Sequence, residues 1–173
     1  NKPVLEHYLA GILYAFGDLS ADPAPSNAAH GTGWKPLFNG ADLTGWKGFV
    51  ADPPKRAKMS EQELADAQSQ ADAKMQDHWS VVDGVLTFDG QGENICTFDD
   101  YGDFELLVDW KIEEGGDSGI YLRGSPQVQI WDSAKAPEGS GGLYNNQINP
   151  AKPIFCADKP AGEWNTFRIK MIG

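Results

Sequence analysis

The sequence predicts an all-β fold, and three observations lead to that prediction. The stretch from Phe104 to Asp132 contains three short runs of alternating apolar and polar residues, which is the period-2 pattern of half-buried strands. Glycine and proline are frequent, and there are six tryptophans, a composition that suits a β-rich protein with many turns. The dipeptide Asp83-Gly84 lies between two further runs of this kind and is typical of a tight hairpin turn.

The first 33 residues are expected to lie outside this β domain. Apolar residues recur at helical spacing from Val4 to Leu19 and predict a short N-terminal helix. Residues 20–33 are rich in alanine, proline, asparagine and glycine, as a linker would be. The remaining residues, 34–173, are enough chain for one domain with a real core.

A second helix is expected from Ser60 to Gln76, inserted between strands. Ser60 and Glu63 have the spacing of a capping box, in which each side chain bonds the backbone of the other. Small or apolar residues then follow at helical intervals, so one side of the helix can pack on the domain.

Composition excludes several functional classes. The formal net charge of −11 argues against binding to nucleic acid or to an anionic membrane surface. No apolar run is long enough to span a bilayer. The two cysteines, Cys96 and Cys156, do not have metal-ligand spacing, and the sequence leaves open whether they pair.

The alternation also predicts which side chains face the core. Residues of one parity, together with two from the last run at 164–172, are expected between two sheets: Leu106, Val108, Trp110, Ile120, Leu122, Val128, Ile130, Phe167 and Ile169. If the three runs of the central stretch share one sheet, the opposite parity emerges together on its other face: Asp109, Lys111, Tyr121, Arg123, Gln127, Gln129 and Trp131.

This second set of side chains is suited to binding a sugar. Aromatic rings stack on sugar faces, while amides and guanidinium groups bond hydroxyls at fixed angles. The alternative is an ordinary solvated sheet face with scattered charge, because antiparallel sheets often have one wet face.

Seven motifs, in order, resemble the 3-keto-disaccharide hydrolase family. They are LFNGADLTGW, WSVVDGVLTF, FELLVDWKI, GDSGIYLRG, PQVQIWD, GGLY and GEWNTFRIK. The resemblance runs from Trp34 to the last residue and does not cover the first helix. It implies a concanavalin A-like jelly roll of two antiparallel sheets, and a periplasmic or extracellular location. Family members continue with further strands, so the run at 164–172 is expected to be completed by another segment or chain.

The resemblance implies cleavage of glycosides whose sugar carries a ketone at C3. Such a ketone acidifies the C2 hydrogen, so a general base can remove it and the resulting enediolate can expel the glycosidic oxygen from C1. Water then adds back. Two other readings stay open: a non-catalytic, lectin-like module, since fold does not fix function, and a conventional glycoside hydrolase with two carboxylates.

Matching the motifs residue by residue, Asp117, Arg123, Gln129 and Asp132 fall where the family places site groups. The expected catalytic residues are Asp117, Arg123 and Asp132. The residues expected to contact the sugar are Asp109, Lys111, Tyr121, Gln127, Gln129, Trp131 and Tyr144.

Several assignments within this set remain open. Gln127 stands where many members have Glu, and an amide is not a general base at neutral pH, so the base is one of Asp117, Asp132 and Asp109. Asp117 also fits a turn-forming role, and Arg123 also fits an ion pair. Carboxylates and carbonyls suit Ca²⁺ or Mn²⁺, but no loop has a recognisable ligand spacing, so a metal is left open.

Overall fold

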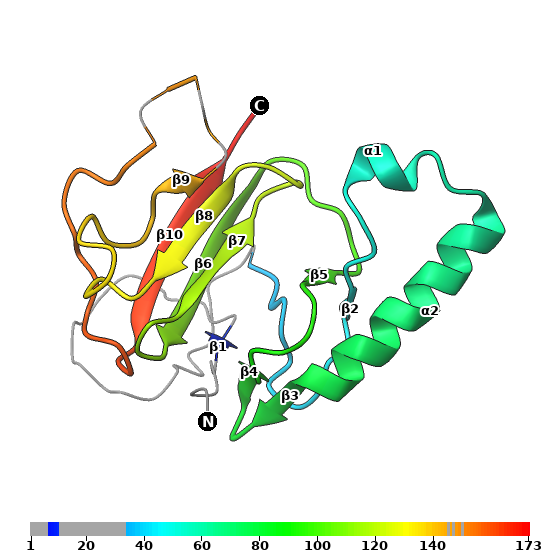
Figure 1. The fold of residues 1–173 in the computed structure, drawn as a ribbon, viewed down its shortest axis with the longest axis horizontal. Helices are drawn as coiled ribbons and strands as arrows, with labels where there is room; N and C mark the ends of the chain where they lie inside the picture. The colour runs from blue at the N-terminus through cyan, green and yellow to red at the C-terminus, as the bar shows by residue number, and fades with distance from the viewer. Residues whose placement is uncertain (1–6, 11–33, 145, 147, 150) are drawn as a thin grey trace.

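Strands predominate over helices in the computed structural model, which describes residues 7–10, 34–144, 146, 148–149 and 151–173 (Figure 1). The strands are β1 (His7–Ala10), β2 (Trp46–Gly48), β3 (Trp79–Val82), β4 (Val85–Phe88), β5 (Ile95–Thr97), β6 (Phe104–Ile112), β7 (Asp117–Tyr121), β8 (Gln127–Trp131), β9 (Leu143–Tyr144) and β10 (Asn165–Met171), and the helices are α1 (Pro53–Arg56) and α2 (Glu61–His78). All pairings among the described strands are antiparallel. The architecture is consistent with the predicted all-β class.

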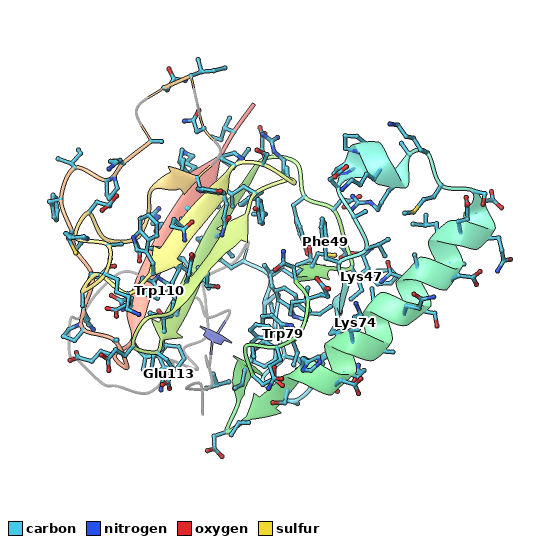
Figure 2. The ribbon with its side chains drawn as sticks, in the orientation of Figure 1. Lys47, Phe49, Lys74, Trp79, Trp110 and Glu113 are labelled. Carbon is cyan, nitrogen blue, oxygen red and sulfur yellow. The ribbon has the colours of Figure 1, made fainter. Side chains whose placement is uncertain are left out.

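The described strands form three sheets. A five-stranded sheet has the order β10-β6-β1-β4-β3, a three-stranded sheet has the order β7-β8-β9, and β2 pairs with β5. Trp110 and Ile112 of β6 pack against Ile130 of β8, with Ile120 and Phe167 beside them. Trp110, labelled in Figure 2, is almost fully buried. Its ring centroid lies 5.1 Å from that of Phe167. The five-stranded and three-stranded sheets therefore share one core.

The three runs of the central stretch do not share one sheet, so the condition for all their polar side chains to emerge on one face is not met. β6 belongs to the five-stranded sheet, whereas β7 and β8 belong to the three-stranded sheet. The reason lies in the turn that begins at Glu113, labelled in Figure 2, where the Gly116 N–H donates to the Glu113 carbonyl. A Cβ on Gly116 would lie 2.3 Å from Cγ1 of Ile112. The chain thus folds directly over a core side chain and passes to the other sheet, a close approach that requires glycine.

The predicted core faces are confirmed for the most part. Val108, Trp110, Leu122, Val128 and Ile130 are buried, and the other four members of the predicted set are partly buried: Leu106, Ile120, Phe167 and Ile169. Leu107 and Asp109, of the opposite parity on β6, are buried as well. Alternation did not indicate this, because it separates the two faces of a strand but does not show how far each face is buried.

The predicted N-terminal helix is wrong where it can be compared with the structure. His7–Ala10 form β1, which lies between β4 and β6 and pairs with both. The rest of the predicted helix and the predicted linker at 20–33 lie outside the described residues. Pairing on two sides satisfies the backbone of this segment through the sheet, and such tertiary pairing overrides a local helical pattern.

Two local predictions are confirmed. Asp83 and Gly84 both have positive φ, as a two-residue hairpin turn requires, and they join β3 to β4. α2 begins after Ser60 with the predicted capping box: the Glu63 N–H donates to Ser60 Oγ, and the Ser60 N–H donates to Glu63 Oε2. In Figure 1, α2 stands to one side of the larger sheets, where it packs on β2.

The last strand lies at an edge. β10 pairs with β6 from Asn165 to Met171, and the described part of the chain gives it no partner on its other side.

Candidate active site on the three-stranded sheet

The candidate site is the face of the three-stranded sheet that is turned away from the core, called here the outer face of β7-β8-β9. The register sets its side chains in rows, because residues paired across antiparallel strands point to the same side. Tyr121 lies opposite Gln127, which lies opposite Tyr144. Gly119 lies opposite Gln129, and Asp117 lies opposite Trp131. The predicted convergence of these groups on one face is thus a direct result of register.

Glycine at position 119 makes room for the middle of this face. A Cβ there would lie 2.0 Å from Nε2 of Gln127, so the Gln127 side chain lies over Gly119. Tyr121 and Tyr144, on either side of Gln127, are 46% and 57% exposed. Two accessible aromatic rings therefore flank an amide, an arrangement that suits contact with a sugar.

On this face, the buried side chain of Gln129 is hydrogen-bonded to the carboxylate of exposed Asp117. The Gln129 amide donates from Nε2 to Asp117 Oδ1 at 2.6 Å and to the Ser118 carbonyl at 3.0 Å. Gln129 is 5% exposed, whereas Asp117 is exposed. Gln129 therefore holds the carboxylate of an exposed residue rather than reaching solvent itself.

Trp131 is tied to the loop that follows β8. Its indole Nε1 donates to the Gly139 carbonyl at 2.7 Å, and its backbone N–H donates to Ser140 Oγ at 3.1 Å. The half-buried indole lies across the strand pair from Asp117. Cross-strand neighbours have Cβ atoms about 4.5–5.5 Å apart, so the ring and the carboxylate border the same area of the face.

The structure does not bring Arg123 to Asp117. Arg123 is exposed in the turn after β7 and has a φ of +51°. At a strand rise of about 3.3 Å per residue, the two ends of β7 are about 13 Å apart, and Arg123 lies beyond Tyr121. A Cβ on the next residue, Gly124, would lie 3.6 Å from Cγ of Pro53, so this turn packs beside the start of α1.

Asp132 lies at the Asp117 end, but its side chain serves the backbone. Its Oδ2 accepts from the Gly115 N–H at 2.8 Å and its Oδ1 accepts from the Ala134 N–H at 2.9 Å. These backbone hydrogen bonds hold the pKa of Asp132 below its ordinary value. Both oxygens thus bridge two turns, and the low pKa makes Asp132 a weak base.

Asp109 and Lys111 lie apart from the other predicted residues, because their strand belongs to the other sheet. They have the parity opposite to Trp110, so they face away from the shared core on the far side of the five-stranded sheet. Asp109 is 6% exposed, accepts a hydrogen bond from Thr166 Oγ1, and has a pKa raised by burial. Lys111 lies with its Nζ 5.2 Å from the ring centroid of Trp164.

Two features of the structure had no signal in the sequence. One is the hydrogen bond between Ser140 and Asp158, next to Trp131. Both residues come from a Gly- and Pro-rich stretch in which no motif spacing is recognisable. A surface depression of about 380 Å³ lies elsewhere, near the Lys35–Asp99 ion pair and the exposed ring of Phe98. No predicted site residue lines it.

The described residues contain no group of three or more His, Cys, Asp or Glu side chains placed to hold a metal ion. Cys96 and Cys156 are both free thiols, and burial raises the pKa of Cys96. Within the same residues, no helix has the length and apolar character needed to cross a bilayer.

Comparison with known proteins gives a family. The profile of the 3-keto-alpha-glucoside-1,2-lyase-like domain matches residues 33–173. A curated relative from Bacteroides thetaiotaomicron, named 3-keto-disaccharide hydrolase, is 25% identical over 173 residues, an alignment that covers 79% of this chain and 52% of the relative. The chain thus spans about half the length of that relative. No solved structure matches this chain. Because the profile covers most of the chain, the protein belongs to the family of 3-keto-alpha-glucoside-1,2-lyase-like domains.

Proposed function

We propose that this chain cleaves the glycosidic bond of 3-keto-disaccharides or related 3-keto-glycosides on the outer face of β7-β8-β9. The observation that carries the proposal is an exposed carboxylate, Asp117, held by a buried amide on a face that also presents three aromatic rings. The name of the Bacteroides relative and the family profile support the same substrate class.

Asp117 is the proposed general base. With Oδ1 engaged by Gln129, its second oxygen takes the proton from C2 of the sugar. The electrons of the C2–H bond form a C2=C3 double bond, and the negative charge moves to the C3 oxygen. The enediolate then re-forms the ketone and makes a C1=C2 double bond as the bond from C1 to the glycosidic oxygen breaks. That oxygen leaves with a proton, and water adds its hydroxyl to C1 and a proton to C2.

Arg123 is proposed to stabilise the negative charge on the C3 oxygen. Because its backbone lies at the far end of the β7-β8 hairpin, its side chain has to extend back along the outer face to do so. Tyr121, Gln127, Trp131 and Tyr144 are proposed to bind the sugar by stacking and hydrogen bonding. No step is assigned to a divalent cation.

The proposal is tested with the 173-residue chain and two matched substrates, a 3-keto-disaccharide and the same disaccharide without the ketone. We expect cleavage of the keto compound alone, with one solvent deuterium at C2 of the product when the reaction is run in D₂O. Equal cleavage of both substrates would contradict the ketone-assisted mechanism. It would favour a two-carboxylate hydrolase, which the engagement of both Asp132 oxygens by backbone N–H groups disfavours.

A lectin-like module is the second candidate, and one observation favours it. Asp117 and Arg123 lie at opposite ends of the hairpin, while the groups suited to sugar binding lie between them. Binding of both disaccharides without cleavage of either would identify this function.

The finer architecture forms part of the proposal. The two sheets that share the core are proposed to belong to a concanavalin A-like jelly roll, in which a further segment or chain pairs with the open edge of β10. The test compares the protection of the β10 amides from hydrogen exchange in two samples. One is the 173-residue chain alone, and the other is the protein as isolated from its host. Equal protection in both would contradict an added strand.

The proposed location is periplasmic or extracellular, as the family resemblance implies. Fractionation of the native host, with an antibody to this chain, would place it. Recovery in the cytoplasmic fraction would contradict the proposal.

A further inference from the structure

Trp131 is hydrogen-bonded to two consecutive residues of the loop after β8. The indole Nε1 donates to the Gly139 carbonyl at 2.7 Å, and the backbone N–H donates to Ser140 Oγ at 3.1 Å. These bonds fix the ring relative to the loop as well as to its own strand. The orientation of the indole therefore depends on how firmly residues 139 and 140 are held.

Those two residues are held by a segment 18 positions further along the chain. Asp158 Oδ2 accepts from the Ser140 N–H and from Ser140 Oγ, both at 2.8 Å. Hydrogen bonds to a carboxylate are roughly twice as strong as neutral ones, and Ser140 is only 7% exposed. One buried hydroxyl thus accepts from the Trp131 backbone N–H and donates to Asp158. It ties the strand at Trp131 to the carboxylate, while the indole is bonded to the neighbouring residue, Gly139.

Close packing supports the same link. Gly139 has a φ of +77°, and a Cβ there would lie 2.7 Å from Sγ of Cys156. The segment that carries Asp158 therefore runs directly against the loop, without room for a larger residue at position 139. This contact limits how far the loop can move away from β8.

We propose that Ser140 and Asp158 are positioning residues that hold the Trp131 indole as the stacking platform for the sugar beside Asp117. The inference rests on the proposed function, because it assigns the ring a substrate. Trp131 and Asp117 are cross-strand neighbours, so rotation of the indole displaces the sugar relative to the base. A misplacement of about 1 Å at a reacting centre can lower the rate by about 10²-fold.

The test compares Ser140→Ala with Ser60→Ala. Both remove a serine hydroxyl that accepts a backbone N–H, but Ser60 caps α2 and is not in contact with the outer face of β7-β8-β9. With a 3-keto-disaccharide, Ser140→Ala is expected to lower kcat/KM by about 10- to 100-fold, whereas Ser60→Ala leaves it unchanged. Asp158→Asn, which keeps an acceptor oxygen but loses the charge, should give a smaller loss in the same direction.

A double-mutant cycle separates positioning from general destabilisation. If Ser140 acts through the ring, Ser140→Ala should cause no further loss in a Trp131→Ala background. Additive losses would overturn the proposal, as would an unchanged kcat/KM in Ser140→Ala. If Ser140→Ala does not fold, the cycle is run with Asp158→Asn.

The two proposals fail in different ways. If the wild-type chain binds the sugar without cleaving it, the cleavage mechanism is wrong. The double-mutant cycle is then calculated from the dissociation constants of the sugar. Non-additive affinity losses would still support the positioning role. If the wild-type chain neither binds nor cleaves either disaccharide, both proposals are overturned.

Discussion

The outer faces of the two sheets that share the core differ in how their polar groups are engaged. On the five-stranded sheet, Thr166 bonds Asp109 and Arg168 pairs with Glu105, so polar side chains meet one another within the face. On the three-stranded sheet, Asp117 is exposed and the rings of Tyr121 and Tyr144 reach solvent. The same alternation produced both faces. Alternation therefore predicts which side chains point away from the core, but not which of them remain free to bind a substrate.

The largest expected effect is a loss of turnover that distinguishes the carboxylate of Asp117 from that of Asp109. Asp117→Asn removes the proposed base and should lower turnover of a 3-keto-disaccharide by about 10²–10⁴-fold, because an amide does not accept the C2 proton. Asp109→Asn is the matched control on the other sheet and should leave turnover unchanged. Steady-state kinetics of both variants decides the matter. An active Asp117→Asn with an inactive Asp109→Asn would reverse the comparison between the faces.

The next effect concerns Arg123. If it stabilises the charge on the C3 oxygen, Arg123→Ala should lower kcat by about 10²–10³-fold. The change in the free energy of unfolding should stay within about 1–2 kcal/mol, since the side chain lies in an exposed turn. Arg123→Lys keeps the charge and serves as the control.

Kinetics and thermal melting of the same preparation separate the roles of Arg123. A rise in KM with kcat unchanged would make Arg123 a sugar ligand at the hairpin tip. Retained activity with a collapsed Tm would make it structural.

A smaller effect should distinguish the two amides of the three-stranded sheet. Gln129→Leu leaves the Ser118 carbonyl and Asp117 Oδ1 without their donor and should destabilise the fold by about 1–3 kcal/mol. Gln127→Leu, on the same strand and face, should change stability by no more than about 0.5 kcal/mol, because that side chain is not buried. Urea unfolding measures both, and equal losses would contradict the supporting role of Gln129.

The smallest effect is a difference in pH dependence between Asp109 and Asp132. Burial raises the pKa of Asp109 above its unfolded value of about 3.9, so the folded state binds more protons in the interval between the two values. The stability of the wild type therefore falls as pH rises through that interval. Asp109→Asn should gain stability relative to wild type from acid to neutral pH.

Asp132 should behave in the opposite way. Backbone hydrogen bonds lower its pKa, so its contribution is present above the unfolded value and is lost as pH falls through the folded one. Asp132→Asn should be least stable relative to wild type at neutral pH, and the deficit should shrink in acid. Melting curves between about pH 3 and pH 7 test both variants, and a shared direction would show that one of the pKa shifts has the wrong sign.

Local features were predictable from sequence because their causes are local. The hairpin at Asp83-Gly84 needs two residues that tolerate positive φ, and the capping box of α2 needs a serine three positions before a glutamate. The alternation in β7 and β8 placed Tyr121, Gln127, Gln129 and Trp131 on one face. The ordered motifs gave the family.

Only the tertiary structure decided which strands are neighbours. Gly116 folds over Ile112 and sends β7 to the other sheet, which separates Asp109 and Lys111 from the rest of the predicted site. Pairing on both sides made His7–Ala10 a strand. The Gly115 N–H, 17 positions earlier in the chain, took the oxygen of Asp132 that the nearby Ala134 N–H leaves open. Alternation fixes the side of a strand on which each residue lies, because that depends on the backbone of the strand alone. The partner of each strand, and the hydrogen bonds left to each carboxylate, depend on segments far along the chain, and no local pattern encodes them.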